Sequence, residues 1–106
     1  MGEYFLIANL DKKQLIEPHD FNAPGESVGY SAKLPHLCNH KISGVLVYLL
    51  TTCDYYPLMG AWATDRVLVV GDEGSGYLIY EEIRESDSWE DITKEVAAGF
   101  FDFIKD

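Results

Sequence analysis

A cluster of histidines and cysteines has residue types and spacing that could do chemistry. The run His36-x-Cys38-x-His40 puts three potential zinc ligands close together. Three further groups could complete a set of four ligands, namely His19, Asp20 and Cys53. The paired Cys-x-x-Cys and His-Glu-x-x-His spacings of common zinc sites are missing from the sequence. A zinc-binding protein or a metal-dependent enzyme is therefore an alternative hypothesis, not the main one.

The geometry of this cluster depends on the element that carries it. On a strand, His36, Cys38 and His40 would share one face, whereas on a helix Cys38 would point about 200° away from the histidines. A Cys–His nucleophile needs thiol and imidazole within hydrogen-bond reach, which the helical arrangement does not provide. Leu34, Leu37 and Cys38 follow the i, i+3, i+4 spacing of a helix. We therefore expect a short helix that buries Cys38 and leaves both histidines in solvent.

A glycine-rich run at Gly71–Gly76 follows a predicted strand, as phosphate-binding loops do. It departs from the G-x-G-x-x-G pattern, has no lysine, and places Asp72 and Glu73 where an anion would sit. It also lacks the alternate-residue ligand spacing of an EF-hand calcium loop. We expect a simple turn and no bound cofactor. Since no catalytic residue can be identified, we favour a protein that is not an enzyme.

Acidic residues are concentrated at one end of the chain. The net charge is −10, and residues 72–106 carry eleven acids and three bases, which is −8 of that total. Such a field repels nucleic acid and anionic lipid and attracts basic protein surfaces, although a merely solvated acidic face is the simpler interpretation. The candidate partner-binding residues are Glu81, Glu82, Glu85, Asp87, Glu90, Asp91, Glu95, Asp102 and Asp106. We expect an interaction or regulatory protein that binds a basic protein surface and makes no direct contact with nucleic acid.

The bulk composition predicts a single globular domain over residues 1–106. Hydrophobic residues make up 47% of the chain and charged residues 25%. No uninterrupted apolar stretch approaches the ~18 residues of a membrane span. The amino terminus has Glu3 where a signal peptide needs basic residues. We therefore expect a cytoplasmic protein that does not contact membranes, with both cysteines as thiols.

The first third of the chain predicts a hairpin and a loop. An apolar run at 4–8 and a second short segment at 14–17 flank a polar turn and indicate two strands, the second ended by Pro18. Residues 18–33 collect prolines, glycines and polar residues and predict a long loop. Three side chains could anchor this loop, namely Phe21, Val28 and Tyr30.

The next segment is apolar on most sides, so its type is harder to derive. Ser43 is a plausible N-cap for a helix. The residues at helical spacing behind it are Leu46, Leu49, Leu50 and Cys53. A buried strand at 45–50 fits the same apolar run nearly as well, and the length of the segment favours the helix.

The middle of the chain indicates a second hairpin. Residues around Trp62 and the run Val67–Val70 flank a two-residue turn at Thr64-Asp65, and the β-branched run is typical of a central strand. A tryptophan beside a strand is usually part of the core, so we expect Trp62 to be buried. Residues 77–83 fit a helix and an alternating strand, and we favour the helix.

The last segment predicts an amphipathic helix with Thr93 as its N-cap. The buried stripe is expected to consist of Val96, Phe100, Phe103 and Ile104, opposite a carboxylate ridge. Phe101 lies off this stripe, as a second packing contact or an exposed aromatic. Together these elements predict an α+β domain, in which an antiparallel sheet of about four strands packs with two to three helices.

Two segments carry a resemblance to other proteins. The opening MGEYFLIANLDKK, followed by Pro18 and Phe21, and the later Gly60-x-Trp62-Ala63-x-Asp65-Arg66 are similar to a group of small uncharacterised microbial proteins. The closing helix of that group is led by a step like Asp91-Ile92-Thr93. The resemblance covers most of the chain. It implies an α+β domain and no particular activity, cofactor or site residue.

Overall fold

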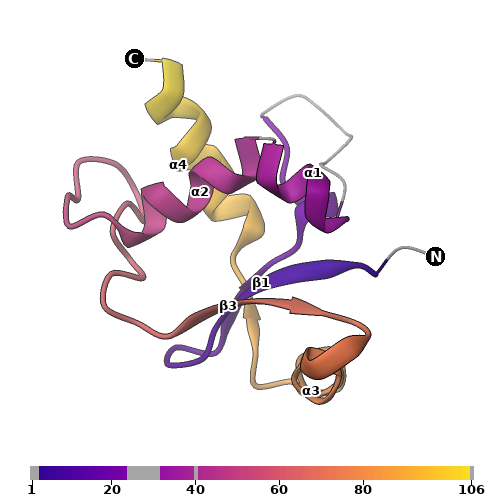
Figure 1. Ribbon diagram of the computed structural model, residues 1–106. Helices are drawn as coiled ribbons and strands as arrows, with labels where there is room; N and C mark the ends of the chain where they lie inside the picture. Colours follow the sequence, from indigo (N-terminus) through magenta and orange to yellow (C-terminus); the bar gives the residue numbers. More distant parts are fainter. Residues whose placement is uncertain (1–2, 24–31, 40, 106) are drawn as a thin grey trace.

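The computed structural model of the protein describes residues 3–23, 32–39 and 41–105 (Figure 1). Its elements in chain order are β1 (Phe5–Asn9), β2 (Gln14–Ile16), the 3₁₀ turn η1 (Pro18–Asp20), α1 (Leu34–Asn39), α2 (Lys41–Leu50), β3 (Val67–Gly71), the 3₁₀ turn η2 (Gly74–Gly76), α3 (Tyr77–Glu85), β4 (Glu90–Asp91) and α4 (Thr93–Lys105). The α+β class and the C-terminal helix are confirmed. The helical interpretations of the segments at 45–50 and 77–83 are confirmed as well.

The four strands form one mixed sheet in the order β3-β1-β2-β4. β1 pairs antiparallel with β2, where Ile7 faces Ile16, and antiparallel with β3, where Ile7 faces Val69. β4 joins β2 in parallel orientation. The β1–β2 hairpin is therefore confirmed, whereas β3 is an edge strand and the prediction of a central strand was wrong. Its apolar sequence arises because helices cover parts of both faces, not because a strand lies on each side.

Alternation along β1 divides the interior into two cores. Ile7 points into the main core with Trp62, Val96 and Phe100, which α2 and α4 cover. Leu6 and Ala8 point into a second core, which Ile83 of α3 closes. Figure 1 shows α2 and α4 above the sheet and α3 below it.

Helix α2 has a different buried face from the predicted one. It begins at Lys41, before the expected cap at Ser43. The side chains that it buries are Ile42, Val45, Tyr48 and Leu49. Leu50 and Cys53 were expected in this face, but Leu50 is exposed and Cys53 follows the helix as an exposed residue. Because apolar residues lie nearly all round the helix, the pattern alone does not decide which side meets the core.

The residues between α2 and β3 form successive turns, so the predicted second hairpin is wrong. Gly60 donates its backbone N–H to the Tyr48 carbonyl and Trp62 donates to that of Leu49, which folds the segment back onto the end of α2. Gly60 has a φ of +76°, and a Cβ there would lie 2.5 Å from the Cys53 carbonyl oxygen. Trp62 is fully buried, as expected for a core residue.

Helix α4 confirms part of the predicted stripe. Val96 and Phe100 are buried, and Phe101 is a second packing contact whose ring lies 5.2 Å from that of Phe21. Phe103 and Ile104 are each 39% exposed, which corrects the prediction that they are buried. Phe103 is covered in part, because its ring lies 5.6 Å from those of Tyr48 and Tyr56, but it lies at the end of α4 that extends away from the sheet (Figure 1).

The start of α4 is capped differently from the prediction. Thr93 is the first helical residue, and its N–H donates to Asp91 Oδ1 at 2.9 Å. The Thr93 hydroxyl accepts the backbone N–H of Glu17 at 2.8 Å. Asp91 therefore satisfies the free amide of the helix end, while Thr93 ties it to the end of β2.

The predicted loop over 18–33 is described only in part. Phe21 is fully buried and anchors the chain just after η1. The other two expected anchors, Val28 and Tyr30, lie outside the described residues.

Candidate functional site

The histidine and cysteine candidates are carried by separate elements. His36 and Cys38 lie on α1, as the helical interpretation predicts. Cys38 is exposed, and so is Leu34, so the prediction that they enter the core with Leu37 was wrong for both. The helix has six residues, and Leu37 is the buried one among those whose burial is described.

His19 belongs to a different part of the surface. It lies in η1 and lines a cavity of about 300 Å³ together with Tyr4, whose ring centroid is 6.2 Å away. Within the described residues, no three His, Cys, Asp or Glu side chains are arranged to hold a metal ion. His40 lies outside those residues. The structure therefore adds no support to the zinc hypothesis.

The charged residues of the His19 cavity are largely engaged with one another. Arg84 of α3 pairs with Glu17 and donates to the Tyr80 hydroxyl at 2.9 Å. Burial lowers the pKa of Arg84, but the hydrogen bonds with Tyr80 and Glu17 outweigh it and raise this pKa. Asp72 accepts the Tyr4 backbone N–H at 3.0 Å. The Arg84–Glu17 pair ties α3 to the end of β2, and the Asp72–Tyr4 contact ties the end of β3 to the start of β1. Both are structural roles.

The predicted acidic residues are divided between the two sides of the sheet. Helix α3 carries Glu81, Glu82 and Glu85 below the sheet, and α4 carries Glu95 and Asp102 above it. Asp87, Glu90 and Asp91 lie in and before β4, and Asp106 is outside the described residues. Helices α3 and α4 thus carry their acids on opposite sides of the sheet, and three more lie in and before β4 at its edge.

Several of these carboxylates also accept hydrogen bonds from within the fold. Glu82 accepts the Trp89 indole N–H at 3.2 Å, and Glu90 accepts the Gln14 amide at 3.0 Å. Glu81 accepts the Tyr77 hydroxyl at 3.2 Å, and its negative charge raises the pKa of Tyr77. Glu85, Asp87, Glu95 and Asp102 are exposed. Part of the acidic set therefore also serves the structure.

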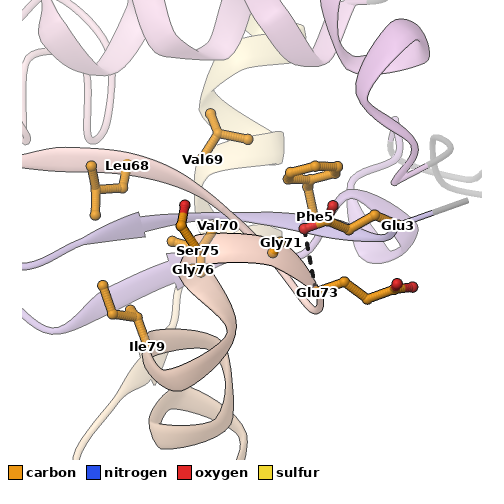
Figure 2. A pocket seen from close by; sticks show the side chains of 11 residues that line it. Glu3, Phe5, Leu68, Val69, Val70, Gly71, Glu73, Ser75, Gly76 and Ile79 are labelled. Atoms are coloured by element: carbon orange, nitrogen blue, oxygen red, sulfur yellow. Dashed lines mark hydrogen bonds between the residues drawn. The ribbon is translucent and has the colours of Figure 1, made fainter.

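A cavity of about 390 Å³ lies along the outer side of β3. Figure 2 shows Val69 and Phe5 on one side of the strand and Leu68 with Ile79 on the other. The remaining lining residues are Glu3, Val70, Gly71, Glu73, Gly74, Ser75 and Gly76. Apolar side chains therefore form one part of the wall, and the polar turn after β3 closes one end.

The charged groups of this cavity are both carboxylates. Glu3 folds across the end of β3, where its Oε2 accepts the Glu73 backbone N–H at 3.2 Å. A Cβ on Gly71 would lie 1.9 Å from the same oxygen, so the glycine leaves room for the Glu3 side chain. Among the described residues, the lining has no nucleophilic thiol, imidazole or cation, so the arrangement suits binding of a partner better than catalysis.

Sequence reasoning missed this site. It identified only the Gly71–Gly76 run, which is a turn as predicted. Glu3, Phe5 and Ile79 come from distant parts of the chain and meet only because β1 pairs with β3 and α3 packs beneath. The available signal was the uncharged run Val67–Gly71, which was interpreted as a central strand.

The segments that carry the resemblance contact each other. Trp62 donates its indole N–H to Gln14 at 2.8 Å, and Asp65 accepts the Asn9 amide at 2.9 Å. Arg66 donates its Nε–H to Asp11 at 2.9 Å. We call this set, with Lys12, the hairpin junction: Asn9, Asp11, Lys12, Gln14, Trp62, Asp65 and Arg66. Its polar residues hold the β1–β2 turn against the start of β3.

Comparison with known proteins identifies no relative: no family model, curated protein or solved structure matches the chain. Among the helices of residues 3–23, 32–39 and 41–105, none is long and apolar enough to cross a membrane.

Proposed function

We propose that the protein is a small cytoplasmic interaction protein that binds a basic segment of a partner protein and performs no chemistry of its own. The observation that carries the proposal is the cavity along β3, whose charged lining groups, Glu3 and Glu73, are both carboxylates. A cation entering this cavity meets two negative charges beside an apolar wall.

The charge of the whole chain supports the same class of partner. A net charge of −10 on 106 residues favours encounter with basic surfaces and opposes direct binding to nucleic acid. Helix α3 extends this field away from the cavity, because it begins beside β3 and carries Glu81 and Glu85. The acids of α4 lie across the sheet and are expected to contribute less.

Capture of the partner on the immobilised full chain tests the proposal. Lysate of the host cell is applied at low salt, and bound protein is eluted with stepwise increases in salt. Three variants remove two charges each: Glu3→Gln/Glu73→Gln at the cavity, Glu81→Gln/Glu85→Gln on α3, and Glu95→Gln/Asp102→Asn on α4. Glutamine can still accept hydrogen bonds, so the first two variants should retain the local contacts.

We expect a specific partner whose elution shifts to lower salt most strongly for the cavity variant, next for the α3 variant and least for the α4 variant. Two exposed charge pairs correspond to about twofold to thirtyfold in affinity. Recovery of no specific partner would overturn the proposal. Equal shifts for all three variants would do so too, because they would indicate a response to net charge alone.

A further inference from the structure

We propose that the partner segment binds as an added β-strand along the free edge of β3, with alternate side chains in two apolar cavities and a lysine or arginine beside Glu3 and Glu73. This inference rests on the proposed function and names the binding mode and the chemistry of the partner. An extended peptide that adds to a sheet edge gains main-chain hydrogen bonds from the edge and specificity from pockets on alternate sides.

One side of the β3 backbone is unpaired within the part of the chain that the structure describes. Leu10 N–H donates to the Arg66 carbonyl and Asp72 N–H donates to the Tyr4 carbonyl, both at 2.9 Å. Antiparallel pairing alternates, so Leu68 and Val70 direct their peptide groups toward β1 and Val67, Val69 and Gly71 direct theirs outward. Among the described residues, no backbone hydrogen bond is formed on the outer side of Val67 and Val69.

The turn after β3 limits where a strand could be added. A Cβ on Gly76 would lie 3.5 Å from the Gly71 nitrogen and 3.6 Å from its oxygen, so η2 covers the outer side of Gly71. The open part of the edge is therefore the stretch before Gly71. Its outward peptide groups, at Val67 and Val69, offer two N–H donors and two carbonyl acceptors.

Each side of the edge has a place for an incoming side chain. Val69, 42% exposed, borders a second cavity of about 130 Å³, formed by α1, α2 and β1 and lined by Leu34, Leu37 and Leu46 among others. Leu68, 40% exposed, points to the opposite face and borders the part of the Figure 2 cavity next to Ile79; Val69 lines another part of that cavity. Consecutive residues of a strand point to opposite faces. Neighbouring side chains of an added strand would therefore enter the two cavities in turn.

The edge lacks the protection that exposed strands usually have. Natural edge strands carry charged residues, proline or a bulge, whereas Val67–Gly71 has no charge and no proline, and pairs in unbroken register with β1. Leu68 and Val69 are exposed apolar residues that an added strand would cover.

Charge selects the occupant of the edge. A second copy of the chain would bring a further net charge of −10 and a second pair of Glu3 and Glu73 carboxylates, so it is disfavoured by repulsion. A partner segment with alternating apolar residues and one basic residue complements both the apolar cavities and the two carboxylates. We therefore commit to an extended basic-apolar peptide and not to a dimer.

The probe is a displayed library of random peptides of about ten residues, a length that spans a typical strand. The library is selected on the immobilised full chain at low salt, and the strongest binder is synthesised with a fluorescent label. We expect alternating apolar residues with a lysine or arginine near one end. Binding is then measured by fluorescence anisotropy with Val69→Pro and with Val69→Ala as its matched control.

Proline at position 69 removes an outward N–H and leaves the hydrogen bonds to β1 in place. We expect it to weaken binding of the selected peptide about fivefold to tenfold, the value of one or more lost hydrogen bonds. Val69→Ala, which retains the N–H, should have the smaller effect. Amide hydrogen exchange of the unmodified protein gives a second measurement that does not depend on the folding of a variant. The bound peptide should slow exchange at Val67 and Val69, with little change at Leu68 and Val70.

Three results would overturn strand addition. They are selection of no peptide, a selected peptide that protects amides outside β3 from exchange, and a dimer in analytical ultracentrifugation that Val69→Pro dissociates.

If Glu3→Gln/Glu73→Gln weakens capture of the lysate partner but Val69→Pro does not, strand addition fails and the proposed function stands. If Val69→Pro weakens binding of a selected peptide that has no basic residue and is insensitive to salt, basic-segment recognition fails and strand addition stands.

Discussion

The start of β3 and its outer edge differ in how many contacts the rest of the chain makes with them. At the Val67 end, the hairpin junction joins Asp65 to Asn9 and Lys12, and Arg66 to Asp11. Along the outer edge of the strand, the peptide groups of Val67 and Val69 form no backbone hydrogen bond among the described residues, and the side chains of Leu68 and Val69 are exposed. Residue types that suggest chemistry therefore have structural roles here, whereas an uncharged strand forms the candidate binding surface.

This difference follows from what each group requires when it is covered. Burial of a polar group destabilises the fold unless the group has a hydrogen-bond partner. Asn9 is fully buried, and its side chain bonds with Asp65 and with the Lys12 backbone N–H. An exposed apolar edge is stable in solution without a partner and gains free energy when covered. The buried polar group of the junction thus has its partners within the chain, while the β3 edge can still gain contacts from another molecule.

The largest expected effect comes from breaking the junction at its core. Trp62→Ala removes a fully buried ring and its hydrogen bond to Gln14, which should lower the free energy of unfolding by about 3–5 kcal/mol. Urea unfolding followed by circular dichroism measures the change. Trp62→Phe is the control that retains most of the volume and should cost less. A loss below about 1 kcal/mol for Trp62→Ala would contradict the structural role of this residue.

A smaller loss is expected at the buried polar centre of the junction. Asn9→Ala leaves Asp65 and the Lys12 N–H without their common partner, which should reduce stability by about 1–3 kcal/mol. Binding of the selected peptide per folded molecule should be unchanged, since Asn9 does not line the β3 cavity. Reduced affinity of a fully folded Asn9→Ala variant would show that the hairpin junction affects binding at the β3 edge.

Acid should weaken the junction in a defined direction. Hydrogen bonds from Lys12 and Asn9 lower the pKa of Asp65, and those from the backbone and side chain of Arg66 lower that of Asp11. A carboxyl whose folded pKa is depressed contributes stability above its unfolded value of about 3.9 and loses it as pH falls through the folded pKa. The midpoint temperature of thermal unfolding should therefore fall less steeply between neutral pH and about pH 2 for Asp65→Asn than for the unmodified protein. Asp87→Asn, an exposed position outside the junction, is the control, and identical pH profiles for both variants would refute the assignment.

Leu68→Lys separates binding from stability at the open edge. The side chain is 40% exposed, so stability should change by less than about 1 kcal/mol. A lysine at the edge opposes strand addition and removes part of the apolar wall, so affinity for the selected peptide should fall about tenfold. Anisotropy and urea unfolding on the same sample test both statements. Unchanged affinity would remove Leu68 from the binding surface.

The smallest effect is expected at the exposed cysteine of α1. Cys38→Ser should alter stability by less than about 0.5 kcal/mol, because the thiol is not part of the core. A loss above about 1 kcal/mol would restore the original interpretation of Cys38 as a buried residue.

Local patterns in the sequence were sufficient for most elements. The β1–β2 hairpin, α3 and the start of α4 follow from turn residues, periodicity and polar residues near helix ends. They were insufficient where apolar residues lie on every side of an element. The buried face of α2 and the exposure of Phe103 depend on which neighbour reaches them, and that is a property of packing.

The sequence by itself determined the α+β class, the buried position of Trp62 and the excess of acid in the last third, because each depends on residue type and local spacing. Only the tertiary structure decided that β3 lies at the sheet edge, that the acids divide between two sides, and that Glu3, Glu73 and Ile79 share one cavity. The physical reason is that strand order and the contacts of distant segments depend on long-range pairing. The residues of a valine-rich run favour a strand but do not specify which strand pairs with it.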